Sequence, residues 1–330
     1  MAEQRDIVVV GASAGGIDAL ARVVPTLPAD LPATVFVVVH IPAEADSHLP
    51  EILSRWGPMT ATHAVDGEPL RRGRILVAPP DRHLLVDLAH ARVVLGPREN
   101  CHRPAINPLF RSAASSHGRR VIGVVLSGSR DDGATGLASV KQAGGMCVVQ
   151  SPEDAIIPNM PQSALKATAA DHVLPASEIG KLIARLVQEP LGRAPVVEAQ
   201  EPVPEPVLTL ERAGSLSGNF SCPECGGVLQ ERPDGASVVY ICRVGHTYSE
   251  QALMASQSNT LESALWVALR ALEEREDMAR RIADRARKDR RDLTVELFER
   301  RAQEASARAG LIRAALLAGD GGNGQGGQDA

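Results

Sequence analysis

Aromatic residues are scarce in this chain: they make up 2% of its 330 residues, although apolar residues as a whole make up 44%. A sizeable core is therefore expected, but it must be built from Val, Leu, Ile and Ala. Positive charge is not in excess either, because the net charge is −5. The chain thus offers no general electrostatic attraction for nucleic acid or for an anionic membrane. Its length favours two domains with smaller additional pieces.

Neither a targeting segment nor a membrane-spanning segment is expected from this sequence. The N-terminal sequence MAEQRDIVVVGASAGG has an apolar run of four residues preceded by acidic residues, unlike a signal peptide. No stretch approaches the roughly 18 apolar residues needed to cross a bilayer. The cysteine count of five is odd, and three cysteines cluster with a histidine, which favours metal binding over disulfides. These observations predict a cytoplasmic protein without direct membrane insertion.

Short runs of β-branched residues alternate with amphipathic stretches over residues 1–188. Several runs are almost entirely apolar, which is typical of parallel strands buried on both faces. We therefore predict a doubly wound α/β domain with a mainly parallel sheet. Strands are expected at 7–10, 35–39, 75–77, 84–86, 93–95, 122–126 and 147–149, with helices such as 17–24 and 108–116.

The rest of the chain divides by composition into further segments. Residues 189–218 are rich in Pro and Glu, which is typical of an extended linker; we expect this linker to insulate the catalytic domain from the C-terminal segments. Residues 219–250 contain the Cys/His cluster. Leucines at helical spacing over residues 251–318, with a polar patch at 288–292, predict a helical hairpin or coiled coil. Residues 319–330 are Gly-rich and are predicted to form a disordered tail.

A glycine-rich turn follows the first expected strand. The sequence Gly11-Ala12-Ser13-Ala14-Gly15 has the form G-x-S-x-G of a nucleophile elbow, in which glycines permit a tight strand-to-helix turn that exposes the serine hydroxyl. The alternative is a dinucleotide-binding loop. That loop needs glycine at position 13 and an acidic residue at the end of the next strand, where this chain has His40.

Three residues of the types found in a catalytic triad follow expected parallel strands. Ser13 and His40 come after the first two, and the loop after the strand at 122–126 contains Asp131 and Asp132. The carboxyl ends of parallel strands share one sheet edge, so these groups should meet there. His can accept the serine proton near neutral pH, and a carboxylate can orient the imidazole. The Ser–His–Asp order differs from the Ser–Asp–His order of the α/β-hydrolases, which disfavours that family.

The segments GASAGGIDAL, VVVHIP, APPDRHLL, RPAINPLFRSAA, VVLSGSRDDGATGL and NMPQSAL resemble, in this order, signature segments of CheB-type chemotaxis protein-glutamate methylesterases. The resemblance covers residues 5–188. It implies hydrolysis of glutamate γ-methyl esters on methylated chemoreceptor helices, with release of methanol and no cofactor for catalysis; some members also deamidate receptor glutamines. By position it assigns Ser13 as nucleophile, His40 as base and Asp132 as the orienting acid.

Two features depart from the family pattern. Many members begin with a phosphorylatable receiver domain, whereas the first catalytic strand here starts at residue 6 or 7. Phosphorylation in cis is therefore not expected, and a response regulator acting in trans is the corresponding regulatory partner. The family often has Met where this chain has Ser129; backbone N–H groups could still form an oxyanion hole. His83 lies in a family-like segment and is expected to be structural.

The cysteine cluster has the spacing of a zinc site. Cys222 and Cys225 form C-x2-C, and Cys242 and His246 follow as C-x3-H after sixteen intervening residues. Four protein ligands predict a structural zinc ion. Nucleic acid is not an expected partner, because residues 270–308 carry twelve Arg/Lys and ten Asp/Glu, a mixed solvated face. Coiled-coil formation or docking of a partner helix fits this face better. The tail resembles those on some receiver-less members of the same family.

The leading hypothesis is therefore a Ser–His–Asp protein-glutamate methylesterase with structural zinc in a separate module. Two alternatives remain. One is a catalytically silent scaffold that recruits signalling partners through its zinc and helix tail. The other is a small-molecule serine esterase.

Overall fold

The computed structural model describes residues 4–44, 46–191, 220–234 and 237–320. The chain divides into two compact units, residues 1–253 and residues 254–330. Most of the expected linker, 189–218, and of the expected tail, 319–330, lies outside the described residues.

The first unit is built on a seven-stranded sheet in the order β3-β4-β2-β1-β7-β8-β9, in which every neighbouring pair is parallel. Its strands are β1 (Ile7–Ala12), β2 (Thr34–Val39), β3 (Thr60–His63), β4 (Arg74–Val77), β7 (Val121–Val125), β8 (Met146–Gln150) and β9 (His172–Leu174). The strand order reverses between β1 and β7, because β2 flanks β1 on the other side. Ligand sites of open α/β sheets form at such a point.

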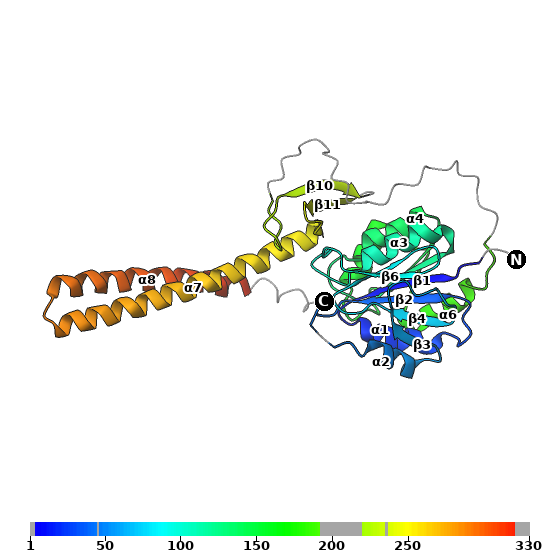
Figure 1. Cartoon of the computed structure of the whole chain (residues 1–330), viewed down its shortest axis with the longest axis horizontal. Helices are drawn as coiled ribbons and strands as arrows, with labels where there is room; N and C mark the ends of the chain where they lie inside the picture. The colour runs from blue at the N-terminus through cyan, green and yellow to red at the C-terminus, as the bar shows by residue number, and fades with distance from the viewer. Residues whose placement is uncertain (1–3, 45, 192–219, 235–236, 321–330) are drawn as a thin grey trace, which may run out of the picture. The chain divides into compact units, whose positions relative to one another are not determined.

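Helices cover both faces of this sheet, with α3 and α4 on one side and α1 and α2 on the other (Figure 1). Val8 and Val10 of β1 belong to one core cluster, and Ile7 and Val9 belong to the other. This alternation follows from the two-residue period of a strand. One face carries α1 (Gly16–Val23), the 3-10 helix η1 (Val24–Thr26), α2 (Leu49–Trp56) and α6 (Ala176–Leu186); the other carries α3 (Ile106–His117), α4 (Ala134–Gln142) and α5 (Asn159–Ala167).

The expected doubly wound, mainly parallel α/β fold is confirmed, with differences in detail. Two expected strands, β5 (His83–Val86) and β6 (Ala91–Val94), form a separate antiparallel hairpin that packs on the core face of α3 instead of joining the parallel sheet. Strands β3 and β9 were not expected. Both lie at the sheet edges and are short and partly exposed, so their residues lack the apolar runs on which the prediction depends.

A small antiparallel sheet of β10 (Leu229–Asp234), β11 (Ser237–Cys242) and β12 (Thr247–Ser249) forms the expected small module. Strand β12 leads directly into α7 (Glu250–Lys288).

The second unit consists of the rest of α7 and of α8 (Asp292–Asp320), which lie side by side (Figure 1). Buried alanines recur at helical spacing on both helices, at Ala279, Ala283 and Ala286 of α7 and at Ala302, Ala305 and Ala309 of α8. Ion pairs join Arg313 to Glu273 and Arg287 to Glu299 across the pair. The expected helical hairpin is thus confirmed, and its small side chains allow the two backbones to approach. None of the described helices is both long enough and apolar enough to cross a membrane.

Candidate active site

Ser13 lies in the turn that joins β1 to α1. Its backbone N–H donates to the carbonyl of Ser127 at 3.0 Å, which ties the turn to the loop after β7. Gly15 has a φ of 73°, in the left-handed region, and a Cβ there would lie 2.6 Å from the Ser127 hydroxyl. Glycine is therefore required both by the backbone conformation and by the close approach. The turn places the Ser13 side chain just past the carboxyl end of β1 and just before the N-terminus of α1.

The structure brings together the three side chains that the sequence analysis selected. His40 follows β2, and its Nδ1 lies 3.2 Å from Ser13 Oγ. Its Nε2 lies 2.8 Å from Asp132 Oδ2, which comes from the loop after β7. A carboxylate can only accept a hydrogen bond, so Nε2 carries the proton of the neutral ring. Nδ1 then carries the lone pair that accepts a hydrogen bond from the Ser13 hydroxyl. In this geometry the ring can take the serine proton.

Asp132 is held by more donors than the imidazole alone. It is 2% exposed, and its carboxylate accepts from the backbone N–H groups of Ile106 at 2.7 Å and Asn107 at 3.2 Å, both at the start of α3. Burial by itself would raise the pKa of Asp132, but the hydrogen bonds from His40 and Ile106 outweigh it and lower that pKa to about 2. The carboxylate therefore stays ionised at neutral pH, in one orientation.

The neighbouring Asp131 points elsewhere. Its Oδ1 accepts from the hydroxyl of Ser249 at 2.9 Å, and burial raises the pKa of Asp131. Gly133, at φ 94°, caps the start of α4 and turns the loop immediately after Asp132. Of the two candidate carboxylates in this loop, only Asp132 contacts His40.

Two residues near His40 were not selected by the sequence analysis. The ring of His102 stacks on the ring of His40, with centroids 3.7 Å apart and planes 10° apart. Burial, followed by the nearby His40, lowers the pKa of His102 to about 4, so the stacked ring is neutral at pH 7. Asn100 is 3% exposed, and its amide nitrogen donates to Asp132 Oδ1 at 3.4 Å. Both lie directly before the family-like segment RPAINPLFRSAA. This position in the sequence was the one indication that they could lie near the site.

A pocket of about 610 Å³ opens beside Ser13. Ser13, His40 and His102 line it together with the basic residues Arg98 and Arg103. Arg103 is held by two hydrogen bonds to Asp81, at 2.7 and 2.9 Å.

Ser129 is exposed in the loop after β7, and a Cβ on its neighbour Gly128 would lie 2.9 Å from the Cβ of Ser13. His83 is buried and hydrogen-bonded to Pro97 and Ala105, as expected for a structural residue.

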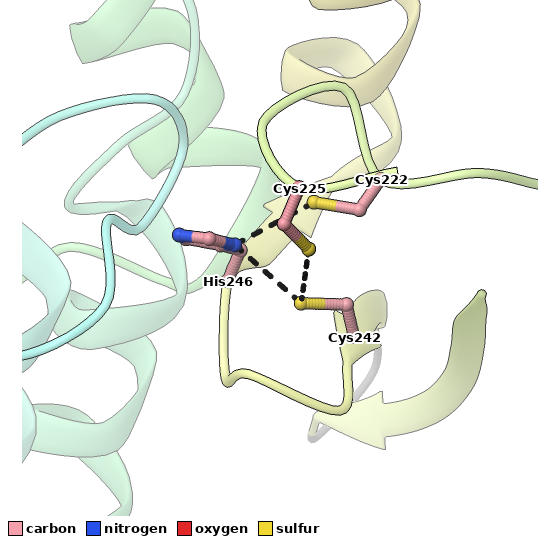
Figure 2. A group of neighbouring side chains, drawn as sticks. All are labelled: Cys222, Cys225, Cys242 and His246. Atoms are coloured by element: carbon pink, nitrogen blue, oxygen red, sulfur yellow. Dashed lines mark hydrogen bonds between the residues drawn. The ribbon is translucent and has the colours of Figure 1, made fainter. Parts of the chain in front are cut away.

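The four expected metal ligands also converge, as Figure 2 shows. One ligand atom from each of Cys222, Cys225, Cys242 and His246 lies within 4.8 Å of the others. The sulfurs of Cys225 and Cys242 are 3.6 Å apart, and His246 Nδ1 is 3.6 Å from Cys222 Sγ and 3.5 Å from Cys242 Sγ. A tetrahedron with Zn–S of about 2.3 Å and Zn–N of about 2.0 Å has edges of about 3.8 and 3.5 Å. The donor set and its spacing therefore fit zinc.

Other side chains support this cluster in the way that outer partners support metal sites. The second ring nitrogen of His246 lies 3.6 Å from a carboxylate oxygen of Glu224, and the Tyr248 hydroxyl lies 3.4 Å from Cys222 Sγ. Tyr248 is 1% exposed at the centre of the module's core.

The linker composition predicts that the module is separate from the catalytic domain, but the structure shows hydrogen bonds between them. Strand β12 runs beside the loop before α3: the N–H of Thr247 donates to the carbonyl of Arg98, and the N–H of Asn100 donates to the carbonyl of Thr247. The expectation of insulation is wrong for this contact, because it was based on residues 189–218 and ignored the residues after the cluster.

Ser13, His40 and Asp132 form a hydrogen-bonded chain at the switch point of a doubly wound α/β sheet, an arrangement that can support acyl transfer. The family model described as CheB methylesterase matches residues 8–183. The chain therefore belongs to the CheB methylesterase family, a family of carboxylic ester hydrolases.

Individual relatives agree with this family. A Leptospira interrogans protein, a putative protein-glutamate methylesterase/protein-glutamine glutaminase, is 38% identical over 187 residues, 56% of this chain and 97% of that protein. An Anaeromyxobacter dehalogenans protein-glutamate methylesterase/protein-glutamine glutaminase is 40% identical over 56% of this chain and 54% of its own length. The crystal structure of the Thermotoga maritima CheB methylesterase catalytic domain matches with a TM-score of 0.54 and 32% identity, covering 56% of this chain and all of that one.

Proposed function

We propose that this protein hydrolyses glutamate γ-methyl esters on methylated chemoreceptor-like proteins and releases methanol. Ser13 is the nucleophile, His40 the general base and Asp132 the acid that orients the imidazole. The observation that carries the proposal is the continuous hydrogen-bond chain from Ser13 Oγ through the His40 ring to Asp132 at the mouth of the pocket.

The reaction proceeds in two halves. Ser13 Oγ attacks the ester carbonyl as its proton moves to His40 Nδ1, and the imidazolium is stabilised by Asp132. The same proton passes to the departing methoxide, so methanol leaves and an acyl-Ser13 ester remains. Water then attacks this ester, with His40 again accepting a proton, and releases the glutamate carboxylate and free Ser13. The positive N-terminus of α1 beside Ser13 favours the developing oxyanion.

Glutamine deamidation is the natural second activity of the same site. The names of the relatives include a glutaminase activity, and an amide side chain differs from the ester only in its leaving group. Ammonia would then take the place of methanol, with His40 supplying the proton to the departing nitrogen.

The site's surroundings support a protein substrate of this kind. Arg98 lines the pocket and can contact acidic groups of a protein substrate. The setting that we propose is reducing and cytoplasmic, where thiols persist. A response regulator in trans is the regulatory partner we propose.

The deciding experiment measures methanol released from membranes that contain methylated chemoreceptors, with wild-type protein and the Ser13→Ala variant. Methanol release that requires Ser13 supports the proposal. Release of carboxylate only from small esters would favour a small-molecule esterase, and no Ser13-dependent hydrolysis of any ester would favour a silent scaffold.

We also propose that the ion held by Cys222, Cys225, Cys242 and His246 is structural zinc. With four protein ligands, it would supply folding free energy and no open coordination position for substrate. The arrangement of the ligand atoms, which matches the edges of a zinc tetrahedron, supports this proposal.

Freshly purified protein should therefore contain one zinc ion per chain. Cys222→Ser should release it and increase backbone hydrogen exchange over residues 220–249, because metal binding and folding of such a module are coupled. Elemental analysis and hydrogen-exchange mass spectrometry measure both results. Cys147→Ala, at a buried cysteine of β8, is the matched control and should retain the metal. A metal-free wild-type preparation would contradict the assignment.

A further inference from the structure

The loop of residues 98–103 lies between the Cys/His module and the candidate triad. On one side, Asn100 Nδ2 donates to Asp132 Oδ1 at 3.4 Å. On the other side, Asn100 Oδ1 accepts from the backbone N–H of Ser249 at 2.8 Å, at the end of β12. The backbone N–H of Asn100 donates to the Thr247 carbonyl, also at 2.8 Å. One buried side chain thus joins the module to the carboxylate that orients His40.

The contact with β12 fixes which end of the Asn100 amide faces Asp132. The Ser249 backbone N–H can only donate, so the amide oxygen must face it. The amide NH2 group then points at Asp132, where it donates to an ionised carboxylate. Without β12 the amide would lose the partner that sets this orientation.

The loop also has a backbone conformation that needs support. Asn100 and Cys101 both have positive φ, 52° and 69°, a region that costs free energy for residues other than glycine. The hydrogen bonds between Arg98, Asn100 and Thr247 hold this stretch as an extension of the module's sheet. An unfolded module would release the loop into other conformations.

Ser249 reaches the aspartate loop by a second route. Its hydroxyl donates to Asp131 Oδ1 at 2.9 Å and accepts from the N–H of Ala252 at 3.1 Å, as a helix N-cap does. Ser249, which ends β12 and precedes α7, therefore contacts both Asn100, a hydrogen-bond donor to Asp132, and Asp131, the chain neighbour of Asp132.

We propose that the Cys/His module is part of the catalytic machinery of this protein, and that Asn100, held by β12, is a positioning residue for Asp132. The inference rests on the proposed Ser13–His40–Asp132 mechanism. Because Ile106 and Asn107 also hold Asp132, loss of Asn100 loosens the carboxylate without freeing it. Misplacement of this order lowers turnover by about 10- to 100-fold.

The test compares kcat and KM for methanol release from methylated receptor membranes, with zinc-loaded and zinc-stripped protein. Asn100→Ala should lower kcat by about 10- to 100-fold and leave KM unchanged, because Asn100 does not line the pocket. Zinc removal should lower the kcat of wild type at least as much, and it should also change KM because residues of the released loop, such as Arg98 and Arg103, line the pocket. In Asn100→Ala the two losses of kcat should not multiply, because both changes break the same connection. Asn259→Ala, at an exposed asparagine of α7, is the matched control and should keep full kcat.

Two readouts do not depend on turnover. The ring proton that His40 Nε2 shares with Asp132 should give a downfield proton NMR resonance in loaded protein, and this resonance should shift or broaden in stripped protein and in Asn100→Ala. Backbone hydrogen exchange over residues 98–103 should rise on zinc removal, while exchange in β1 and β7 stays unchanged.

The inference is overturned if stripped wild type, with zinc loss verified by elemental analysis, keeps its kcat and its His40 resonance, or if Asn100→Ala does. That failure differs from failure of the proposed function. If the triad hypothesis fails, Ser13→Ala retains activity whatever the state of the module; if only the module's catalytic role fails, activity requires Ser13 but ignores zinc and Asn100.

Discussion

Replacing Ser13 or His40 by alanine should each lower turnover by roughly 10⁴-fold or more, and the double variant should be little worse than either single one. The physical reason is the hydrogen-bond chain: Ser13 Oγ becomes a strong nucleophile only when His40 Nδ1, 3.2 Å away, takes its proton. Once either partner is gone, the other has nothing to act on. The measurement is kcat for methanol release for the two single variants and the double variant.

Matched controls separate this effect from general damage. Ser115→Ala and His90→Ala change exposed residues of the same types and should stay within a few-fold of wild type. Losses from the two single variants that multiply in the double variant would indicate independent roles and contradict a triad. Retained turnover in Ser13→Ala would end the serine mechanism.

Asp132→Asn should lower turnover by about 10⁴-fold while keeping the fold. Asp132 Oδ1 accepts from Asn100, Asn107 and Gly133. Oδ2 accepts from His40 Nε2 and from the Ile106 N–H. An asparagine therefore keeps more hydrogen bonds with its oxygen at the Oδ1 position. Its NH2 group then faces His40 Nε2 and donates to it. The ring proton moves to Nδ1, and the tautomer that can accept the Ser13 proton is lost.

Asp131→Asn is the matched comparison for this prediction. It should lower turnover by less than about tenfold, because it leaves the triad intact. An amide oxygen can still accept from the Ser249 hydroxyl, so the hydrogen bond at 2.9 Å is preserved. Burial already raises the pKa of Asp131, so a neutral side chain suits its surroundings. Measurement of kcat for the two variants shows which of the two carboxylates orients His40. A crippled Asp131→Asn beside a mildly affected Asp132→Asn would show that the orienting role had been assigned to the wrong carboxylate.

Short-range patterns accounted for much of the site. Ser13, His40 and the loop with Asp131 and Asp132 were selected because each follows an apolar run typical of a buried strand, and the family resemblance then favoured Asp132. The parallel order of β2, β1 and β7 brings those strand ends together. His102 and Asn100 could not be selected in this way. They lie in an irregular loop, and their roles depend on a ring stack and on a contact with a strand far along the chain.

The sequence by itself determined the α/β class of the first domain, the family, the spacing of the four metal ligands and the helical hairpin. These depend on local periodicity, on glycines at tight turns and on the order of short motifs, all of which are readable within a few residues of one another. Only the tertiary structure decided that β5 and β6 leave the parallel sheet and that β12 reaches the loop beside Asp132. The hydrogen bond between Asn100 and Ser249 joins residues 149 positions apart. Such a pairing depends on how whole elements pack, and no local pattern of residue types encodes it.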